Sequence, residues 1–311
     1  MSTSTTTTLR ADAGSDVPGL AAAPHDTAVL AAFPTAVYVA GDDGRVVAVE
    51  ASDGVGLPNA LRLRRPASGL ALGDVPVSSV LRVGDDRVEL PGTTVVVDRW
   101  VDHTYVPADV DPVVLERRLV GLDATIAERA PLEGGLVART GGLVAALVTS
   151  DLDAAAEHAR GLVGLGPGLT PSGDDLLCGA LAAVHTLAPR LALTDLDALA
   201  TELGERLLVD AAARTTALSA TLLLHAHRGQ LARPARAVLR GLLGRTPVPP
   251  ALDALLAVGH SSGRDLAVGL SLGAHVTLAA AADANTHTAP ASTAGTPPAT
   301  PSTPPTPGAR R

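Results

Sequence analysis

The sequence contains no lysine, so all 24 of its basic residues are arginine. Catalysis through a lysine Schiff base is therefore excluded, and so is a pyridoxal cofactor anchored to lysine. The usual phosphate-binding loop of nucleotide hydrolases is excluded as well, because it needs a lysine before its serine or threonine.

Cysteine and aromatic residues are almost as scarce. The only cysteine is Cys178, which excludes an internal disulfide and a cysteine-based structural zinc site. The four residues of the Phe, Tyr and Trp types are Phe33, Tyr38, Trp100 and Tyr105. The C-terminal half thus has no platform on which bases could stack, and the net charge of −8 disfavours a nucleic-acid surface. We expect no nucleic-acid partner.

Targeting and membrane signals are also missing. The N-terminus lacks a basic patch followed by an apolar run, which is the pattern of a signal peptide. The longest unbroken apolar stretches are shorter than the roughly 18–20 residues that span a bilayer. We expect a soluble, cytoplasmic protein without a membrane partner.

Composition divides the chain into four parts. Residues 1–27 open with Ser-Thr repeats, and residues 283–311 are almost entirely Ala, Thr, Ser, Gly and Pro. Neither end has enough large apolar side chains to offset the entropy of ordering, so both are expected to be disordered. Residues 28–108 are predicted to form a β-rich domain, and residues 109–282 a helical domain.

The β-rich domain contains short runs with the period of strands. Turn signals such as Gly41-Asp42-Asp43-Gly44 and Gly84-Asp85-Asp86 separate them, and no helix intervenes. The expected strands cover residues 35–40, 45–50, 61–64, 80–83, 87–90 and 94–101. This pattern predicts an antiparallel sheet or a small barrel.

Beyond residue 112 the period becomes helical. Ala/Leu-rich segments place apolar residues at the spacing of one buried helix face, and their breaks carry Gly or Pro. The expected helices cover residues 113–130, 152–163, 174–188, 196–207, 215–228, 233–243, 250–258 and 264–282. The fold class is therefore α+β, with an all-α C-terminal domain.

The segment from Gly164 to Asp175 reads Gly-Leu-Gly-Pro-Gly-Leu-Thr-Pro-Ser-Gly-Asp-Asp and leads into an expected helix. Glycine permits close approach of the backbone to a ligand. A helix N-terminus favours an anion, because its amides are unpaired and its dipole is positive there. We therefore expect an anion-binding loop. Ser172 and Asp175 also have the spacing of a capping box, which would begin a helix without binding anything.

A second stretch repeats part of this loop. Both copies read Ser-Gly-x-Asp-Leu-x-x-Gly, one from Ser172 and the other from Ser262, and each has a histidine thirteen residues after the serine. The repeat predicts two helix N-termini that face each other and bind one small anion through Gly173 and Gly263. The glycine seven residues after each serine would let the two helices pack closely.

The two copies differ at Asp174 and Arg264. An arginine can hold a carboxylate or phosphate through two parallel hydrogen bonds. His260, with Asp174 and Asp175, could complete a site for Mg²⁺ or Mn²⁺, which favour oxygen ligands. Because Asp175 and Asp265 are predicted to cap their helices, we assign no metal ligand and no required cofactor.

Three segments together resemble the AllH family. They are the loop from Gly164 to Asp175, the run Thr216-Ala-Leu-Ser-Ala, and the Gly-His-Ser-Ser-Gly-Arg-Asp run at 259–265 with two further glycines after it. The resemblance covers roughly residues 160–280. That family is linked to the oxamate carbamoyltransferase of anaerobic allantoin degradation, in which an AllH subunit is required with two unrelated subunits.

The resemblance implies that a carbamoyl group moves between an oxamate nitrogen and phosphate. Such a transfer needs positioning and oxyanion stabilisation rather than a covalent nucleophile. Arg264 would stabilise charge, and Asp174 or His260 would orient the amine, so these three are the candidate catalytic residues. The residues expected to contact substrate or phosphate are Gly166, Gly168, Thr170, Ser172, Gly173, Ser262 and Gly263.

The expected partners are therefore a small anionic substrate and the other carbamoyltransferase subunits. The chain lacks the Ser-Thr-Arg-Thr-Arg loop of aspartate and ornithine carbamoyltransferases, so their mechanism does not transfer. Two alternatives stay open at this point. The chain could be a non-catalytic scaffold or metabolite-sensing subunit, or it could be a stand-alone metal-dependent hydrolase.

Overall fold

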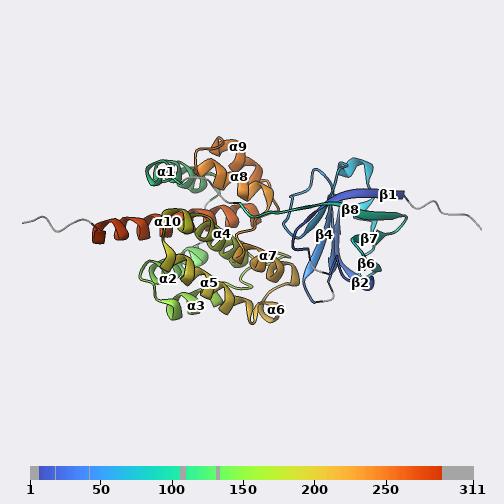
Figure 1. The fold of residues 1–311 in the computed structure, drawn as a ribbon, viewed down its shortest axis with the longest axis horizontal. Helices are drawn as coiled ribbons and strands as arrows, with labels where there is room; N and C mark the ends of the chain where they lie inside the picture. The colour runs from blue at the N-terminus through green and yellow to red at the C-terminus, as the bar shows by residue number, and fades with distance from the viewer. Residues whose placement is uncertain (1–6, 18, 42, 106–109, 131–133, 289–311) are drawn as a thin grey trace, which may run out of the picture.

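The computed structural model of the 311-residue chain describes residues 7–17, 19–41, 43–105, 110–130 and 134–288. An N-terminal β-barrel lies at one end of the molecule, and a helical region makes up the other end (Figure 1). The predicted α+β fold is confirmed.

Eight strands close the barrel in the order β1-β5-β4-β3-β2-β6-β7-β8. Two neighbouring pairs, β1 with β8 and β4 with β5, are parallel, whereas the others are antiparallel. Small aliphatic side chains such as Val37 and Val49 fill the interior. The strands are β1 Thr7–Gly14, β2 His25–Phe33, β3 Ala36–Ala40, β4 Val46–Glu50, β5 Ala60–Leu63, β6 Val80–Gly84, β7 Arg87–Leu90 and β8 Thr93–Val101, with 3₁₀ turns η1 Ala67–Gly69 and η2 Leu72–Asp74.

Strand β1 overturns the expectation that residues 1–27 are disordered. Residues 7–14 form β1, which pairs with β8 along its whole length, whereas residues 1–6 lie outside the described part of the chain. Ala11 and Ala13 are fully buried inside the barrel, while the charged side chains of Arg10 and Asp12, which alternate with them, face outward. The Thr-rich composition concealed this alternation, although threonine is a good strand former because its β-branched side chain fits a pleated surface.

The helical region begins at residue 112. Its helices are α1 Pro112–Arg129, α2 Gly134–Val148, α3 Leu152–Arg160, α4 Ser172–Leu187, α5 Thr194–Leu208, α6 Ala211–Arg214, α7 Ala217–His227, α8 Arg233–Leu242, α9 Val248–Leu256 and α10 Ser262–Thr288, with the 3₁₀ turn η3 Ala188–Leu191. The expected helices are all present, whereas α2 and the short α6 were not expected. Glycines 134, 135, 141 and 142 weaken the helical signal of α2, because glycine is a poor helix former.

Helix α10 also reaches further than expected. Residues 283–288, which were assigned to a disordered tail, continue this helix, and residues 289–311 lie outside the described part of the chain. By length and composition α10 could cross a membrane, but 61% of its apolar window is buried in the protein. That burial is typical of the core helix of a globular fold.

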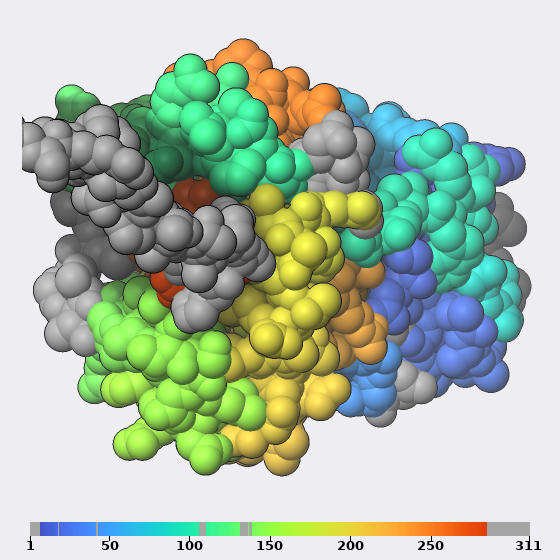
Figure 2. Space-filling view, turned by 60° about the vertical axis from the view of Figure 1, so that its left-hand side comes forward, coloured from blue at the N-terminus to red at the C-terminus, as the bar shows by residue number. Residues whose placement is uncertain are grey.

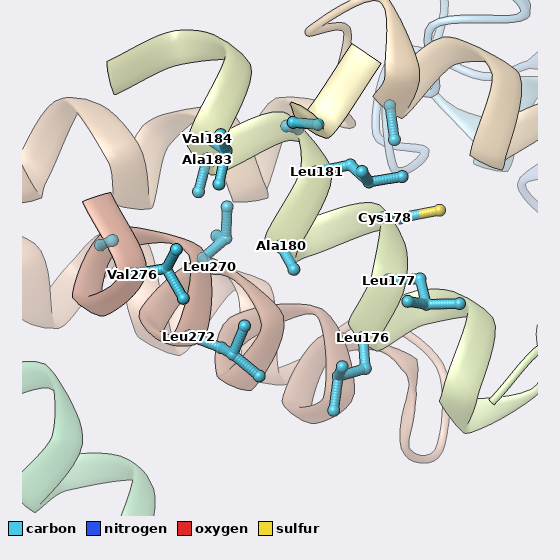
Figure 3. Packing of buried hydrophobic residues seen from close by; sticks show 14 of the residues in the cluster. Leu176, Leu177, Cys178, Ala180, Leu181, Ala183, Val184, Leu270, Leu272 and Val276 are labelled. Atoms are coloured by element: carbon cyan, nitrogen blue, oxygen red, sulfur yellow. The ribbon is translucent and has the colours of Figure 1, made fainter. Parts of the chain in front are cut away.

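Helices α4 and α10 form the centre of the helical region, with other helices around them (Figure 1). Ala180, Ala183 and Leu270 lie between these two helices, whereas Cys178 points away from α10 (Figure 3). Small side chains at this contact allow the two backbones to approach closely. The core of the helical region is thus built around one helix pair.

The barrel and the helical region lie against each other (Figure 2). The amide of Val46 in β4 donates to the Thr221 hydroxyl in α7 across a distance of 2.9 Å, and the amide of Arg233 donates to the carbonyl of Gly56 at 3.0 Å. An isolated β-bridge joins Thr104 to Gln230. These bonds fix the position of α7 and α8 against the barrel.

Candidate functional site

The two repeated helix starts are neighbours and run in parallel. Near the N-termini, the hydroxyls of Thr170 and Ser262 are 2.7 Å apart. About two turns further on, a Cβ built on Gly179 would lie 2.4 Å from the carbonyl oxygen of Leu266, and one on Gly269 would lie 2.1 Å from that of Leu176. The structure therefore brings the starts of α4 and α10 together, with the two repeated glycines at the crossing.

Gly173 and Gly263, however, do not present free amides. The Gly173 amide donates to the carbonyl of Leu165 at 2.9 Å, and the Gly263 amide donates to that of Val258 at 3.0 Å. A Cβ on either glycine would lie within about 2 Å of a carbonyl oxygen of the preceding segment. The prediction that these two amides contact phosphate is wrong, because both are already bonded. Their role is close packing of the backbone.

The free amides lie in the preceding loop instead. Gly164, Gly166 and Gly168 adopt φ values of 74°, 116° and 98°, which side chains rarely tolerate. Among the described residues, the amides with no acceptor include those of Gly166, Gly168, Leu169, Thr170 and Ser172. A loop that presents several unpaired amides beside a helix N-terminus is suited to an anion.

Arg264 reaches the same place from α10. It lines a cavity of about 740 Å³ together with Gly166, Gly168, Ser172 and His260, and we call this the anion cavity. Ser261 and Arg139, which lies in α2, complete its polar lining, and none of the lining residues in the described part of the chain is acidic. In a chain with a net charge of −8, this is a local concentration of positive charge.

Asp265 holds Arg264 in place. Its Oδ1 accepts a hydrogen bond from Nε of Arg264 at 2.8 Å, and the Asp265 side chain is fully buried. The Oδ2 atom has no partner among the described residues. Neither oxygen therefore caps α10, and the capping role predicted for Asp265 is wrong. Its carboxylate orients the guanidinium and leaves the terminal NH₂ groups available to a ligand.

Asp174 holds the loop rather than a substrate. One carboxylate oxygen accepts from the amide of Gly164 at 2.9 Å, and the other accepts from the Thr215 hydroxyl. Burial raises the pKa of Asp174, and the bonds from Thr215, Gly164 and Ser219 oppose that rise. The side chain is 1% exposed and does not line the anion cavity, so the structure does not place it where it could orient an amine.

Asp175 was expected to form a capping box with Ser172, and this prediction is wrong. Helix α4 starts one residue earlier than a capping box requires, so Pro171 is the N-cap and no side chain caps the helix. Asp175 is 6% exposed instead, and its Oδ2 has no partner among the described residues. Burial raises its pKa to about 8; the hydroxyls of Ser262 and Thr170 oppose this rise, and nearby carboxylates add to it.

Thr216 ties the loop to α7. Its hydroxyl accepts from the amide of Ser219 at 3.0 Å, as an N-cap does, and donates to the carbonyl of Leu169 at 2.5 Å. Thr216→Ala should lower the free energy of unfolding by about 1–2 kcal/mol, which is the usual effect of losing a cap. Urea denaturation would measure it. Thr216→Ser keeps the hydroxyl and should lose much less; equal losses would mean that the methyl group matters rather than the two hydrogen bonds.

The structure gives Cys178 a packing role and does not bring the possible metal ligands together. Cys178 is buried on α4, and burial raises the pKa of its thiol well above the ordinary value, so the side chain is an unreactive packing group.

Within the described ranges, no three His, Cys, Asp or Glu side chains are placed to hold a metal ion. His260 lines the anion cavity, whereas Asp174 and Asp175 do not, so the metal grouping considered from the sequence is not assembled.

A comparison with protein families agrees with the position of this site. Residues 162–274 match the model of the family described as oxamate carbamoyltransferase subunit AllH. The resemblance to AllH is confirmed. The AllH match contains the glycine-rich loop, Thr216 and Arg264, and it lies entirely within the helical region. No solved structure matches the chain.

One member of the anion cavity was missed from the sequence. Arg139 stands in α2, whose glycines hid the helix, and no motif connects it with the loop more than twenty residues later. Its guanidinium donates to the carbonyl of Gly161 at 3.3 Å, which holds it beside the loop. The packing of α2 against α3 and α10 brings this charge to the site.

Proposed function

We propose that this chain is an AllH-type subunit of an oxamate carbamoyltransferase-type complex and that its anion cavity binds carbamoyl phosphate or a related small oxyanion. The observation that carries the proposal is the meeting of the unpaired loop amides and Arg264 in one cavity, whose described lining contains no acidic residue. The family match supports the reaction class, because it covers both the glycine-rich loop and the start of α10, which line this cavity.

The chemistry needs little from the protein beyond binding and charge stabilisation. The amide nitrogen of oxamate attacks the carbamoyl carbon, the bond from that carbon to the phosphate oxygen breaks, and phosphate leaves with the electron pair while the nitrogen loses a proton. In the reverse direction, a phosphate oxygen attacks the carbamoyl group of oxalurate and oxamate leaves. Preorganised donors stabilise the charge that develops on oxygen in either direction.

The residues of the anion cavity divide these tasks. The amides of Gly166, Gly168 and Ser172 would donate to phosphate oxygens, and Arg264 would neutralise their charge. His260 is exposed at the edge of the cavity and is the described lining residue that could accept a proton from the attacking amide nitrogen. The other subunits of the complex would supply what this open cavity lacks to exclude water.

Arg264→Gln tests the proposal. Loss of one charge-assisted hydrogen bond costs about 1.5–3 kcal/mol, so affinity for carbamoyl phosphate or phosphate should fall roughly ten- to a hundred-fold. Isothermal titration of the purified chain with carbamoyl phosphate, phosphate, oxamate and oxalurate, each separately, would measure this. Arg240→Gln is the matched control, because Arg240 is exposed on α8 and does not line the cavity.

The outcomes separate the alternatives. Binding of one oxyanion by the wild type and Arg240→Gln but not by Arg264→Gln supports an oxyanion site. If the reconstituted complex with Arg264→Gln keeps full activity although the variant no longer binds the anion, the cavity senses a metabolite and does not take part in the reaction. Equal binding by all three proteins would remove the anion cavity from the function.

A further inference from the structure

A second cavity lies at the junction of the barrel and the helical region. It has a volume of about 280 Å³, and we call it the junction cavity. Its walls come from both parts of the chain: Phe33, Tyr38 and Leu57 from the barrel side, and Asp175, Leu222 and Ser262 from the helical side. The anion cavity and the junction cavity share no lining residue, and the Thr170–Ser262 hydroxyl pair lines only the junction cavity.

The lining of the junction cavity is mostly apolar and has one carboxyl group. Among the described residues that line it, Asp175 is the only acidic one, and none is an arginine or a histidine. Other polar side chains around the cavity are engaged or neutral. The Gln230 Oε1 atom is bonded to Nδ1 of His225 at 2.5 Å, and burial raises the pKa of Tyr38, which keeps its phenol neutral.

Asp175 is unusual because its Oδ2 atom is buried and unpartnered within the described structure. An unsatisfied buried polar atom of this kind destabilises the folded state. The carboxyl group faces Asp174 and Asp265 from α4 and α10, and the hydroxyls of Thr170 and Ser262, with no cation to pair with it in the cavity lining. Such surroundings favour the neutral acid, which can donate one hydrogen bond from its O–H.

We propose that the junction cavity is a second binding site, which takes a small uncharged molecule with an apolar body and one carbonyl oxygen that accepts a hydrogen bond from Asp175. The apolar walls disfavour an ionic ligand, since they offer no counter-charge beyond Asp175 itself. A carbonyl compound satisfies the buried Oδ2 and removes the cost of leaving it unpaired. This site does not depend on the proposed reaction at the anion cavity.

Three probes of similar size, which share a phenyl ring and a two-carbon side chain, test the chemistry: acetophenone, ethylbenzene and 1-phenylethylamine. Each is titrated into the full chain while the methyl resonances of Leu57 and Leu222 are followed by NMR, which locates binding as well as measuring it. Acetophenone should bind roughly threefold to tenfold more tightly than ethylbenzene, which is the value of one hydrogen bond. The amine should bind no better than ethylbenzene.

Variants at Asp175 make the test specific. Asp175→Asn keeps an N–H donor and should keep the preference for acetophenone. Asp175→Leu removes the donor, so acetophenone and ethylbenzene should bind equally, and the folded protein should melt at a higher temperature because the unpaired buried oxygen is gone. Arg264→Gln, in the anion cavity, should leave all three affinities unchanged.

Several results would overturn the proposal. Methyl resonances of the cavity that do not shift with any probe would make it a packing gap. Tighter binding of 1-phenylethylamine would mean that Asp175 is ionised and recognises a cation. Preference for acetophenone that survives in Asp175→Leu would place the hydrogen bond on another group.

Discussion

Gly269→Ala is expected to destabilise the protein by about 3 kcal/mol or more. The added methyl group would lie 2.1 Å from the carbonyl oxygen of Leu176 and 3.0 Å from the Cα of Gly179. Both neighbours are backbone atoms in the middle of α4, so neither can move away as the end of a side chain would. Overpacking of a tight core commonly costs 1–3 kcal/mol, and a clash with the backbone lies at the upper end.

The melting temperature measures this effect. A loss of 3 kcal/mol corresponds to roughly 6–12 °C for a domain of 150–250 residues. The matched control is Gly121→Ala in α1, where the residue is exposed and a Cβ would meet nothing within 4 Å. That substitution should stabilise the protein by about 0.5–1 kcal/mol, because alanine is the better helix former. Similar melting temperatures for the two variants would mean that α4 and α10 do not cross as closely as described.

The parallel crossing of α4 and α10 is the part of the site that the sequence predicts best. Two copies of one motif at a fixed offset place Ser172 and Ser262 at matching helix starts and a glycine at matching depth in each helix. The structure shows both helix starts side by side and both glycines at the contact. A repeat carries this information because equal spacing from equal starts gives equal geometry.

The functions of the residues inside that repeat were harder to predict. The sequence Ser-x-x-Asp at a helix start does not show whether the serine is the N-cap or the first helical residue, because both arrangements have the same residues. Pro171 takes the N-cap position here, which moves Asp175 one place into the helix and turns its carboxylate toward the barrel side. The glycines after each serine likewise looked like anion ligands, although their amides are bonded to Leu165 and Val258.

Features that depend on contacts distant in sequence left no local pattern. The residues of β1 are too poor in apolar side chains to predict a strand by themselves. Pairing with β5 and β8, which come much later in the sequence, holds this strand in the barrel. The junction cavity forms only where the barrel lies against α7, and the sequence around Phe33 and Tyr38 does not predict that contact. Composition and periodicity describe single elements, whereas these features arise only where two elements meet.

The second large effect concerns the pH dependence of stability through Asp175. Its folded-state pKa of about 8 lies far above the value near 4 of an aspartate in the unfolded chain, because burial disfavours the carboxylate. Between these two values the folded state keeps a proton that the unfolded state has released. Rising pH therefore favours unfolding, by about 1.4 kcal/mol per pH unit, until the folded carboxyl itself ionises near pH 8.

Asp175→Asn removes this dependence while preserving the size of the side chain. The free energy of unfolding of the wild type should fall relative to that of the variant by roughly 3 kcal/mol between pH 5 and pH 7. Urea denaturation at intervals of half a pH unit would measure the difference, in which the other titrating groups of the protein cancel. Asp195→Asn, at an exposed position near the start of α5, is the matched control for loss of one carboxyl and should follow the wild type.

A constant difference between wild type and Asp175→Asn from pH 5 to 8 would mean that Asp175 ionises like an exposed carboxyl. The neutral donor required at the junction cavity would then be absent at neutral pH, so this titration also tests the chemistry on which that second site depends.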